Sequence, residues 1–246
     1  MAGGVRPGQP ASRTQGRRDG AGLRRRTGRR IRGTGSPDGG AVSHPSAGAI
    51  GPNALIQTAA ALEAHGGRAL AERVLGMAGL PDVLDAPPAR MVDERQVARL
   101  NRAVFEALPE PEALSVLSDA GKRTGRYVLE NRIPAAARRI LPALPSRVSS
   151  MVLLQAIRRN GWTFAGSGRV TVQCRRPEIV ITANPIPLPG CVWHVGAFAF
   201  LLGSLVTPDA RVTHMRQVHG GLSIDRFAID LQQVRPAGDS SARRSG

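Results

Sequence analysis

Residues 184–206 read NPIPLPGCVWHVGAFAFLLGSLV, and this stretch decides how the rest of the chain is organised. Its three prolines, at positions 185, 187 and 189, exclude a helix and favour an extended loop. The apolar run from Cys191 to Val206 is long enough for a helix but about one turn too short to span a bilayer. Because the run also contains the ionisable His194, we interpret it as a buried core helix whose first turn carries Cys191, Trp193 and His194.

Strands are predicted on both sides of this helix. Before it, residues 169–174 and 178–182 alternate apolar and polar side chains around a turn at 175–177, which is typical of a hairpin. After it, we expect a strand at 211–219, a turn at Gly220-Gly221 and a last strand in which apolar side chains alternate up to residue 231. The period changes from 3.6 to 2 at Trp162, so extended structure is expected from that residue, with a hairpin turn at 166–168.

Helices are predicted upstream of the strands. Their expected limits are a start at Gly51-Pro52-Asn53, a stop at Gly66-Gly67, a second helix at 68–77, a cap at Asp93, and further starts at Pro111, Pro134 and Pro145. The helix after Pro145 carries Val148, Val152 and Gln155 on one face. A block of helices followed by a β-β-α-β-β order predicts an α+β fold, with the N-terminal helices packed on one face of a four-stranded, mostly antiparallel sheet.

Composition divides the chain into three parts. The 246 residues carry a formal net charge of +16, and residues 1–45 supply half of it through ten arginines against Asp19 and Asp38. We expect 1–45 to be a disordered basic tail, 46–236 to form a single domain, and 237–246 to be a frayed end. The tail is either a polybasic patch for anionic lipid or nucleic acid, or a dispensable extension. Nucleic acid is not favoured as a partner, because only eight residues are aromatic.

Cysteine usage and the amino-terminal sequence indicate the cellular compartment. Cys174 and Cys191 form neither a disulfide framework nor a CxxC zinc pair. The amino terminus has no apolar signal region, and no segment is predicted to span a membrane. These features predict a cytoplasmic protein and leave a homodimer open.

Three motifs carry a resemblance to a known family. They are IGPNALIQ at 50–57, ANP at 183–185 with CVWH at 191–194, and GLSIDRFAI at 221–229. Over roughly residues 50–234 the chain resembles the 4-vinyl reductase domain family, and within it the bacteriochlorophyll 4-vinyl reductases of photosynthetic bacteria. The resemblance implies a fold like the vesicle-tethering TRAPP subunits and a role in chlorophyll and bacteriochlorophyll biosynthesis. It implies reduction of the 8-vinyl group of a divinyl (proto)chlorophyllide by an oxidoreductase, with other enzymes of that pathway as partners.

The residues themselves do not supply a reductant. Vinyl reduction needs a hydride donor such as NADPH, a flavin or an iron–sulfur centre, and no motif for these cofactors is recognisable. Residues 166–168 lack the third glycine of a dinucleotide loop. The chain is therefore interpreted either as a reductase or as a substrate carrier and accessory subunit.

The last hairpin departs from the family pattern. Many members of the resembled family carry cysteines there, whereas this chain has Gln217 or Val218 on one side of the turn and Asp225 on the other. We therefore predict no metal site, although His214 and His219 could join Asp225 in a mixed one.

The chemical groups of a chlorophyllide-type tetrapyrrole determine which residues we predict for the ligand site. Its ring needs an apolar slot, which the helix with Trp193, Phe198 and Phe200 and the helix with Leu55 and Leu62 could wall. Its magnesium would accept a histidine nitrogen, from His194 first and from His65 second, while Cys191 and Asn184 complete the mouth. Its propionate needs arginine. The candidates for that role are Arg158, Arg159, Arg169 and Arg175.

Each of these assignments has a structural alternative. His194 and Trp193 could be core side chains, Cys191 a small apolar filler, and Asn184 a turn residue. The alternative function is a small-molecule-sensing or scaffold module that binds an aromatic compound or a lipid.

Overall fold

The computed structural model describes residues 48–231 and contains a four-stranded antiparallel sheet in the order β3-β4-β6-β5. The strands are β3 (Arg169–Gln173), β4 (Glu178–Thr182), β5 (Arg211–His219) and β6 (Leu222–Asp230). Consecutive strands form the two expected hairpins, and β4 pairs with β6 to join them. The predicted fold class is confirmed.

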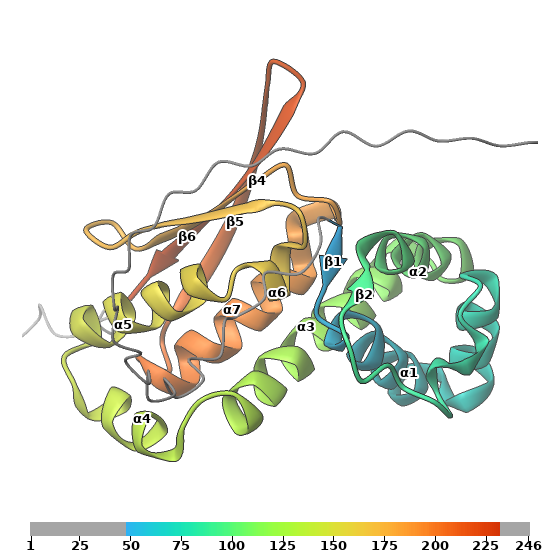
Figure 1. The fold of residues 1–246 in the computed structure, drawn as a ribbon, viewed down its shortest axis with the longest axis horizontal. Coiled ribbons are helices and arrows are strands. Elements are labelled where there is room, and N and C mark those ends of the chain that lie inside the picture. Colours follow the sequence, from blue (N-terminus) through green and yellow to red (C-terminus); the bar gives the residue numbers. More distant parts are fainter. Residues whose placement is uncertain (1–47, 232–246) are drawn as a thin grey trace, which may run out of the picture. The chain divides into compact units, whose positions relative to one another are not determined.

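The apolar run forms α7 (Val192–Leu205), which connects β4 to β5. Figure 1 shows α7 and α5 (Ser146–Arg159) lying along one face of the sheet. The core lies between this face and the helices. Phe198 of α7 packs edge-on against Phe227 of β6 there, and Ile179 and Ile181 of β4 belong to the same buried cluster. Each of the four is at most 1% exposed.

The remaining elements precede the sheet, except η3, which lies between β4 and α7. They are β1 (Ala49–Ile50), α1 (Asn53–Met77), η1 (Pro81–Val83), β2 (Val92–Asp93), α2 (Glu94–Ala107), α3 (Glu110–Asn131), α4 (Ala135–Ile140), η2 (Leu141–Ala143), α6 (Trp162–Ala165) and η3 (Pro189–Cys191). Gly66 and Gly67 leave helical geometry inside α1, with φ of 76° at Gly67, as the glycine pair predicted. Asp93 caps α2 by accepting a 2.8 Å hydrogen bond from the Arg95 amide.

Helices α3 and α7 pack closely. A Cβ atom at Gly121 of α3 would collide with the carbonyl oxygen of Trp193, so only glycine permits this approach. The contact brings the first turn of α7 against the middle of α3. It therefore places Trp193 beside the second half of α3.

The expectation of extended structure from Trp162 is wrong. Residues 162–165 form the short helix α6, in which the Ala165 amide donates to the Gly161 carbonyl at 2.9 Å. Phe164 and Ala165 are adjacent and both buried, which a strand with alternating faces does not allow. Residues 166–168 consequently connect a helix to a strand and are not a hairpin turn.

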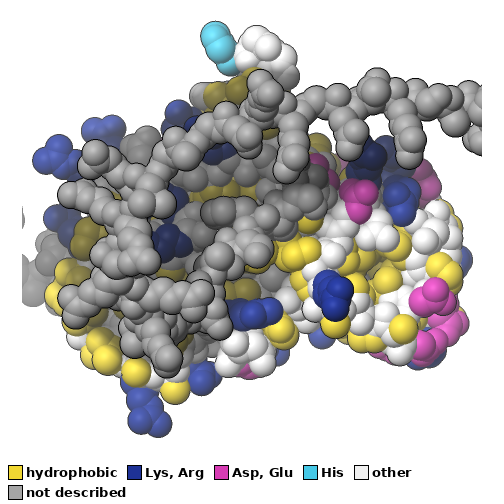
Figure 2. All heavy atoms as spheres, viewed as in Figure 1, with side chains coloured by type: hydrophobic (Ala, Val, Ile, Leu, Met, Phe, Trp, Pro, Cys, Tyr) yellow, Lys and Arg dark blue, Asp and Glu magenta, His cyan; other side chains and the backbone are white. Residues whose placement is uncertain are grey.

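Figure 2 shows that the acidic side chains visible in this view gather over α1 and α2, whereas Lys and Arg side chains predominate on the side of α4 and α5. Among residues 48–231, no helix combines the length and apolar character needed to cross a bilayer. The predictions for segments 1–45 and 237–246 lie outside the described residues, and the single domain at 46–236 stays a prediction.

Candidate functional site

A cavity of about 420 Å³ lies between the start of α1, the second half of α3, and helices α5, α6 and α7. This volume falls within the range of small-molecule pockets, roughly 300–1,000 Å³. Most of its wall is apolar. The aliphatic side chains include Val128, Ile133, Leu141, Leu153, Ile157 and Leu201.

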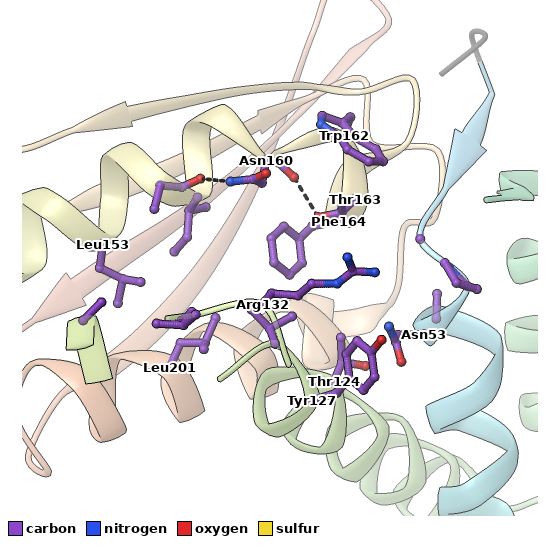
Figure 3. Close-up of a pocket in the computed structure, with 18 of the residues that line it drawn as sticks. Asn53, Thr124, Tyr127, Arg132, Leu153, Asn160, Trp162, Thr163, Phe164 and Leu201 are labelled. Atoms are coloured by element: carbon purple, nitrogen blue, oxygen red, sulfur yellow. Dashed lines mark hydrogen bonds between the residues drawn. The ribbon is translucent and has the colours of Figure 1, made fainter. Parts of the chain in front are cut away.

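The two ends of the cavity differ in polarity. Figure 3 shows Asn53, Thr124 and Tyr127 together at one end, Leu153 at the other, and Arg132 extending between them. The Thr124 hydroxyl donates to the Ala120 carbonyl at 2.9 Å, and Oδ1 of Asn53 accepts from Nε2 of Gln57 at 3.3 Å. The Asn53 amide nitrogen and the Tyr127 phenol remain as the polar groups of that end. An elongated apolar ligand with one polar edge fits this division.

Arg132 is the charged group of the cavity. It follows the last turn of α3 and is exposed, and within residues 48–231 its side chain has no hydrogen bond or ion pair. A guanidinium without an acidic partner suits a ligand carboxylate, which it can bind through two parallel hydrogen bonds. Arg132 could not be found from the sequence, because a single arginine at a helix end gives no periodic signal.

Aromatic side chains complete the wall. Tyr127, Trp162, Phe164 and Trp193 all line the cavity, and they come from three different helices. Half of the chain's eight aromatic residues therefore surround this one space. Such walls favour a flat ring ligand. Of the predicted site residues, Trp193 is the one that the structure places here.

His194 lies behind the cavity wall. Its ring is fully buried, Nε2 lies 3.0 Å from the Phe164 carbonyl oxygen, and the ring packs against Phe198 and Phe227. Within residues 48–231, its Nδ1 has no hydrogen-bond partner. Burial lowers the pKa of His194 to about 4, although the hydrogen bond to the Phe164 carbonyl opposes this shift. The imidazole is therefore neutral at physiological pH.

This histidine makes stability depend on pH. Because its folded pKa, about 4, lies below the unfolded value of 6.5, the unfolded chain takes up the proton first. The contribution of neutral His194 to the free energy of unfolding is therefore complete above pH 6.5. It decreases as the pH falls, and the loss is about 3 kcal/mol at pH 4. We expect His194→Gln, which keeps a donor but does not titrate, to flatten the urea-unfolding free energy between pH 7 and pH 4. An unchanged slope in that variant would contradict the assignment.

Cys191 and Asn184 belong to a second, buried cluster. Cys191 adopts a left-handed backbone conformation, with φ of 43°, and is completely buried. The Asn184 amide donates to Oδ2 of Asp225 at 3.0 Å and lies 3.7 Å from the Cys191 sulfur. The loop before α7 is thus attached to the last strand.

Asp225 is the centre of this cluster. Its carboxylate accepts from Nε of Arg216 at 2.7 Å and lies 2.8 Å from Nε2 of His214. Burial raises the pKa of Asp225, but the hydrogen bonds from Arg216, Asn184 and His214 outweigh burial and bring it to about 2. Burial and the nearby Asp225 charge raise the pKa of Cys191 to about 11. The cluster therefore pairs an ionised aspartate with a protonated thiol.

Ligand atoms of Cys191, His214 and Asp225 lie within 4.8 Å of one another, a geometry that could hold a metal ion. Arg216 already supplies the positive charge that pairs with the Asp225 carboxylate. Its Nη2 also contacts the Cys191 sulfur at 3.3 Å. A metal ion bound here would have to displace both the Cys191 thiol proton and the Arg216 guanidinium. We interpret the cluster as a structural ion network; His219, at the hairpin end, is not part of it.

The other predicted residues lie outside the cavity. Nε2 of His65 lies 3.2 Å from a carboxylate oxygen of Glu112, and both side chains are substantially exposed. Arg158 and Arg169 are exposed, and neither lines the cavity. The structure thus divides the predicted set: Trp193 at the cavity, Cys191 and Asn184 in the ion network, and the remaining residues elsewhere.

The architecture belongs to the class of α+β folds seen in H-NOX proteins. One H-NOX structure, from work on heme distortion, matches with a TM-score of 0.53 at 12% identity, covering 75% of this chain and 96% of that one. A Cs H-NOX mutant matches with a TM-score of 0.50 at 13% identity, covering 75% and 97%. At these identities the likeness shows the fold alone. No family model matches the chain.

Sequence relatives are more specific. The chain is 38% identical to the bacteriochlorophyll synthase 23 kDa chain of Cereibacter sphaeroides over 203 residues, covering 80% of this chain and 94% of the relative. It is 39% identical to the protein of that name from Rhodobacter capsulatus over 183 residues, covering 70% and 83%. The chain therefore belongs to the family of the bacteriochlorophyll synthase 23 kDa chain. The expected link to bacteriochlorophyll biosynthesis is confirmed, while these names do not specify vinyl reduction.

Proposed function

We propose that this protein binds a chlorophyllide-type tetrapyrrole in the 420 Å³ cavity and acts as a carrier or accessory subunit for other bacteriochlorophyll biosynthesis enzymes. One observation carries the proposal: an aromatic-walled cavity with an arginine that forms no ion pair within the described residues, in a member of this family. Family membership supports the pathway, and the cavity supports the kind of ligand. Family membership alone would not indicate the kind of ligand, and the cavity alone would not indicate the pathway.

The ring would enter from the side of Arg132. Arg132, Pro134 and Asn160 are exposed lining residues, so a macrocycle larger than the enclosed volume can extend past them to the surface. Its apolar edge would contact the wall formed by Leu153 and Leu201. Its propionate would meet Arg132 at the mouth, where the carboxylate stays partly hydrated.

The ring's magnesium would meet oxygen donors. No histidine lines the cavity within residues 48–231, and His194 lies behind Phe164 with its Nε2 engaged. Tyr127 offers its phenol oxygen at the polar end, whereas Oδ1 of Asn53 already accepts from Gln57 at 3.3 Å. Oxygen ligands suit this hard cation. We therefore assign the magnesium contact to the Tyr127 oxygen or to a water molecule held at this end of the cavity.

Vinyl reduction is the finer alternative within this proposal. It would require a hydride donor such as NADPH, and this chain would contribute binding and orientation of the ring. Residues 166–168 join a helix to a strand and so do not form the phosphate loop of a dinucleotide fold. Incubating the pure protein with divinyl chlorophyllide and NADPH, with and without host extract, separates catalysis by this chain from assistance to another enzyme.

Arg132→Met is expected to weaken chlorophyllide binding about tenfold, because a charge-assisted hydrogen bond is lost at a partly hydrated site. Titration followed by the Soret band measures this change. The control is Arg102→Met, which removes an exposed arginine from α2, away from the cavity.

A second titration uses chlorophyllide in which the propionate is a methyl ester. Wild-type protein and Arg132→Met should bind the ester equally, since the carboxylate is then absent. Equal loss for acid and ester would show that Arg132 does not contact the carboxylate. No Soret change with the wild type would contradict the proposed function, and native mass spectrometry of protein from its host would then identify a different apolar ligand by mass.

A further inference from the structure

Helices α4 and α5 expose large apolar side chains. Ile140 is 56% exposed, Val148 40%, Met151 46% and Val152 45%. Val152 also lines the cavity, so this surface adjoins the ligand site. Val148 and Val152 share one helix face, as their spacing predicts, and both are exposed in the structure.

The same surface is strongly basic. No aspartate or glutamate occurs between Glu130 and Glu178, and within residues 48–231 none of the arginines in that interval forms an ion pair. Five of these arginines are exposed on α4 and α5: Arg138, Arg139, Arg147, Arg158 and Arg159. Figure 2 shows hydrophobic and basic side chains mixed on this side of the view.

This combination matches an anionic bilayer. Arginines at a membrane surface are attracted by acidic headgroups, and short aliphatic side chains beside them enter the headgroup region. An acidic protein would match the charge equally well. However, the exposed apolar side chains of this surface, which are three aliphatic residues and Met151, include no Trp or Tyr of the kind that anchors protein-protein interfaces. The adjoining cavity also needs a route for an apolar ligand, which a bilayer provides.

We propose that the surface formed by α4 and α5 docks on an anionic lipid bilayer and brings the cavity mouth against it. A tetrapyrrole could then pass between bilayer and cavity with little exposure to water. The identity of the ligand rests on the proposed function; the docking itself does not.

Vesicle flotation with the full chain tests the docking. The wild type is expected to bind phosphatidylcholine vesicles that contain phosphatidylglycerol, and to release them at high salt. Arg138→Gln/Arg139→Gln should lower the partition coefficient roughly 25-fold, since each arginine near an anionic surface contributes about fivefold. The control Arg73→Gln/Arg102→Gln removes the same charge from exposed positions on α1 and α2 and should change little.

Apolar insertion is tested separately. Ile140→Ser/Met151→Ser should weaken binding to the same vesicles while retaining its salt dependence. Equal losses for the two arginine pairs, or none for either, would overturn the proposal, because the attraction would then not be local to this surface. Binding to an acidic protein without binding to vesicles would overturn it as well. Soret titration of Arg138→Gln/Arg139→Gln without vesicles should match the wild type, which keeps this outcome distinct from a failure of ligand binding.

Discussion

Asp225→Ala is expected to lower the free energy of unfolding by about 3 kcal/mol, near the lower limit for a broken buried ion pair. The variant leaves His214 and Arg216 without their shared carboxylate, and it also removes the acceptor for Asn184. We expect a loss near the lower limit because the Arg216 side chain is 31% exposed and water can hydrate it when the carboxylate is removed. Urea unfolding at pH 7, followed by circular dichroism, measures the loss.

Two further variants make this result specific. Asp225→Asn keeps the size of the side chain but removes its charge, so it should fall between the wild type and the alanine variant. Asp85→Ala removes an exposed partner of Arg68 and should leave the unfolding midpoint unchanged. If Asp225→Ala were as stable as Asp85→Ala, the network would not hold the loop before α7 against the last strand.

Ala156→Trp is expected to weaken tetrapyrrole binding by at least about 100-fold, because an indole in the cavity removes the space that the ring needs. Ala156 lies on α5, lines the cavity and is exposed, so the larger side chain can be accommodated without unfolding the helix. Soret titration measures the affinity, and circular dichroism confirms the fold.

The matched control is Ala136→Trp. Ala136 is exposed on α4 and does not line the cavity, whereas its neighbour Ala137 does. This variant should bind the ligand like the wild type. Loss of binding in both variants would indicate a general effect of added tryptophan, and retention of binding in Ala156→Trp would place the ligand elsewhere.

Local sequence signals predicted most of the fold. Alternation identified β3, β4 and β6, the apolar run identified α7, and Gly66-Gly67 marked the break in α1. These signals succeed because each depends on neighbouring residues. The prediction of extended structure from Trp162 was wrong because the apolar residues there alternate over too short a segment to distinguish a strand from one turn of helix.

The site depended on contacts between distant segments. Asn184 and Cys191 meet Asp225 only because β4 pairs with β6, and no local pattern reports that pairing. One signal was available: a two-residue turn at Gly220-Gly221 sets Arg216 opposite Asp225 by register. The cavity was harder to predict, since Arg132 and Trp162 reach it through the packing of three helices.

Hydrogen–deuterium exchange with and without chlorophyllide tests the central claim most directly, because it shows where the ligand binds. Slower exchange is expected in the segments that line the cavity, at 124–134, 152–157 and 160–164, with little change in the β5–β6 hairpin. Slower exchange confined to that hairpin, or no change anywhere at saturating ligand, would contradict the assignment of this cavity as a tetrapyrrole site.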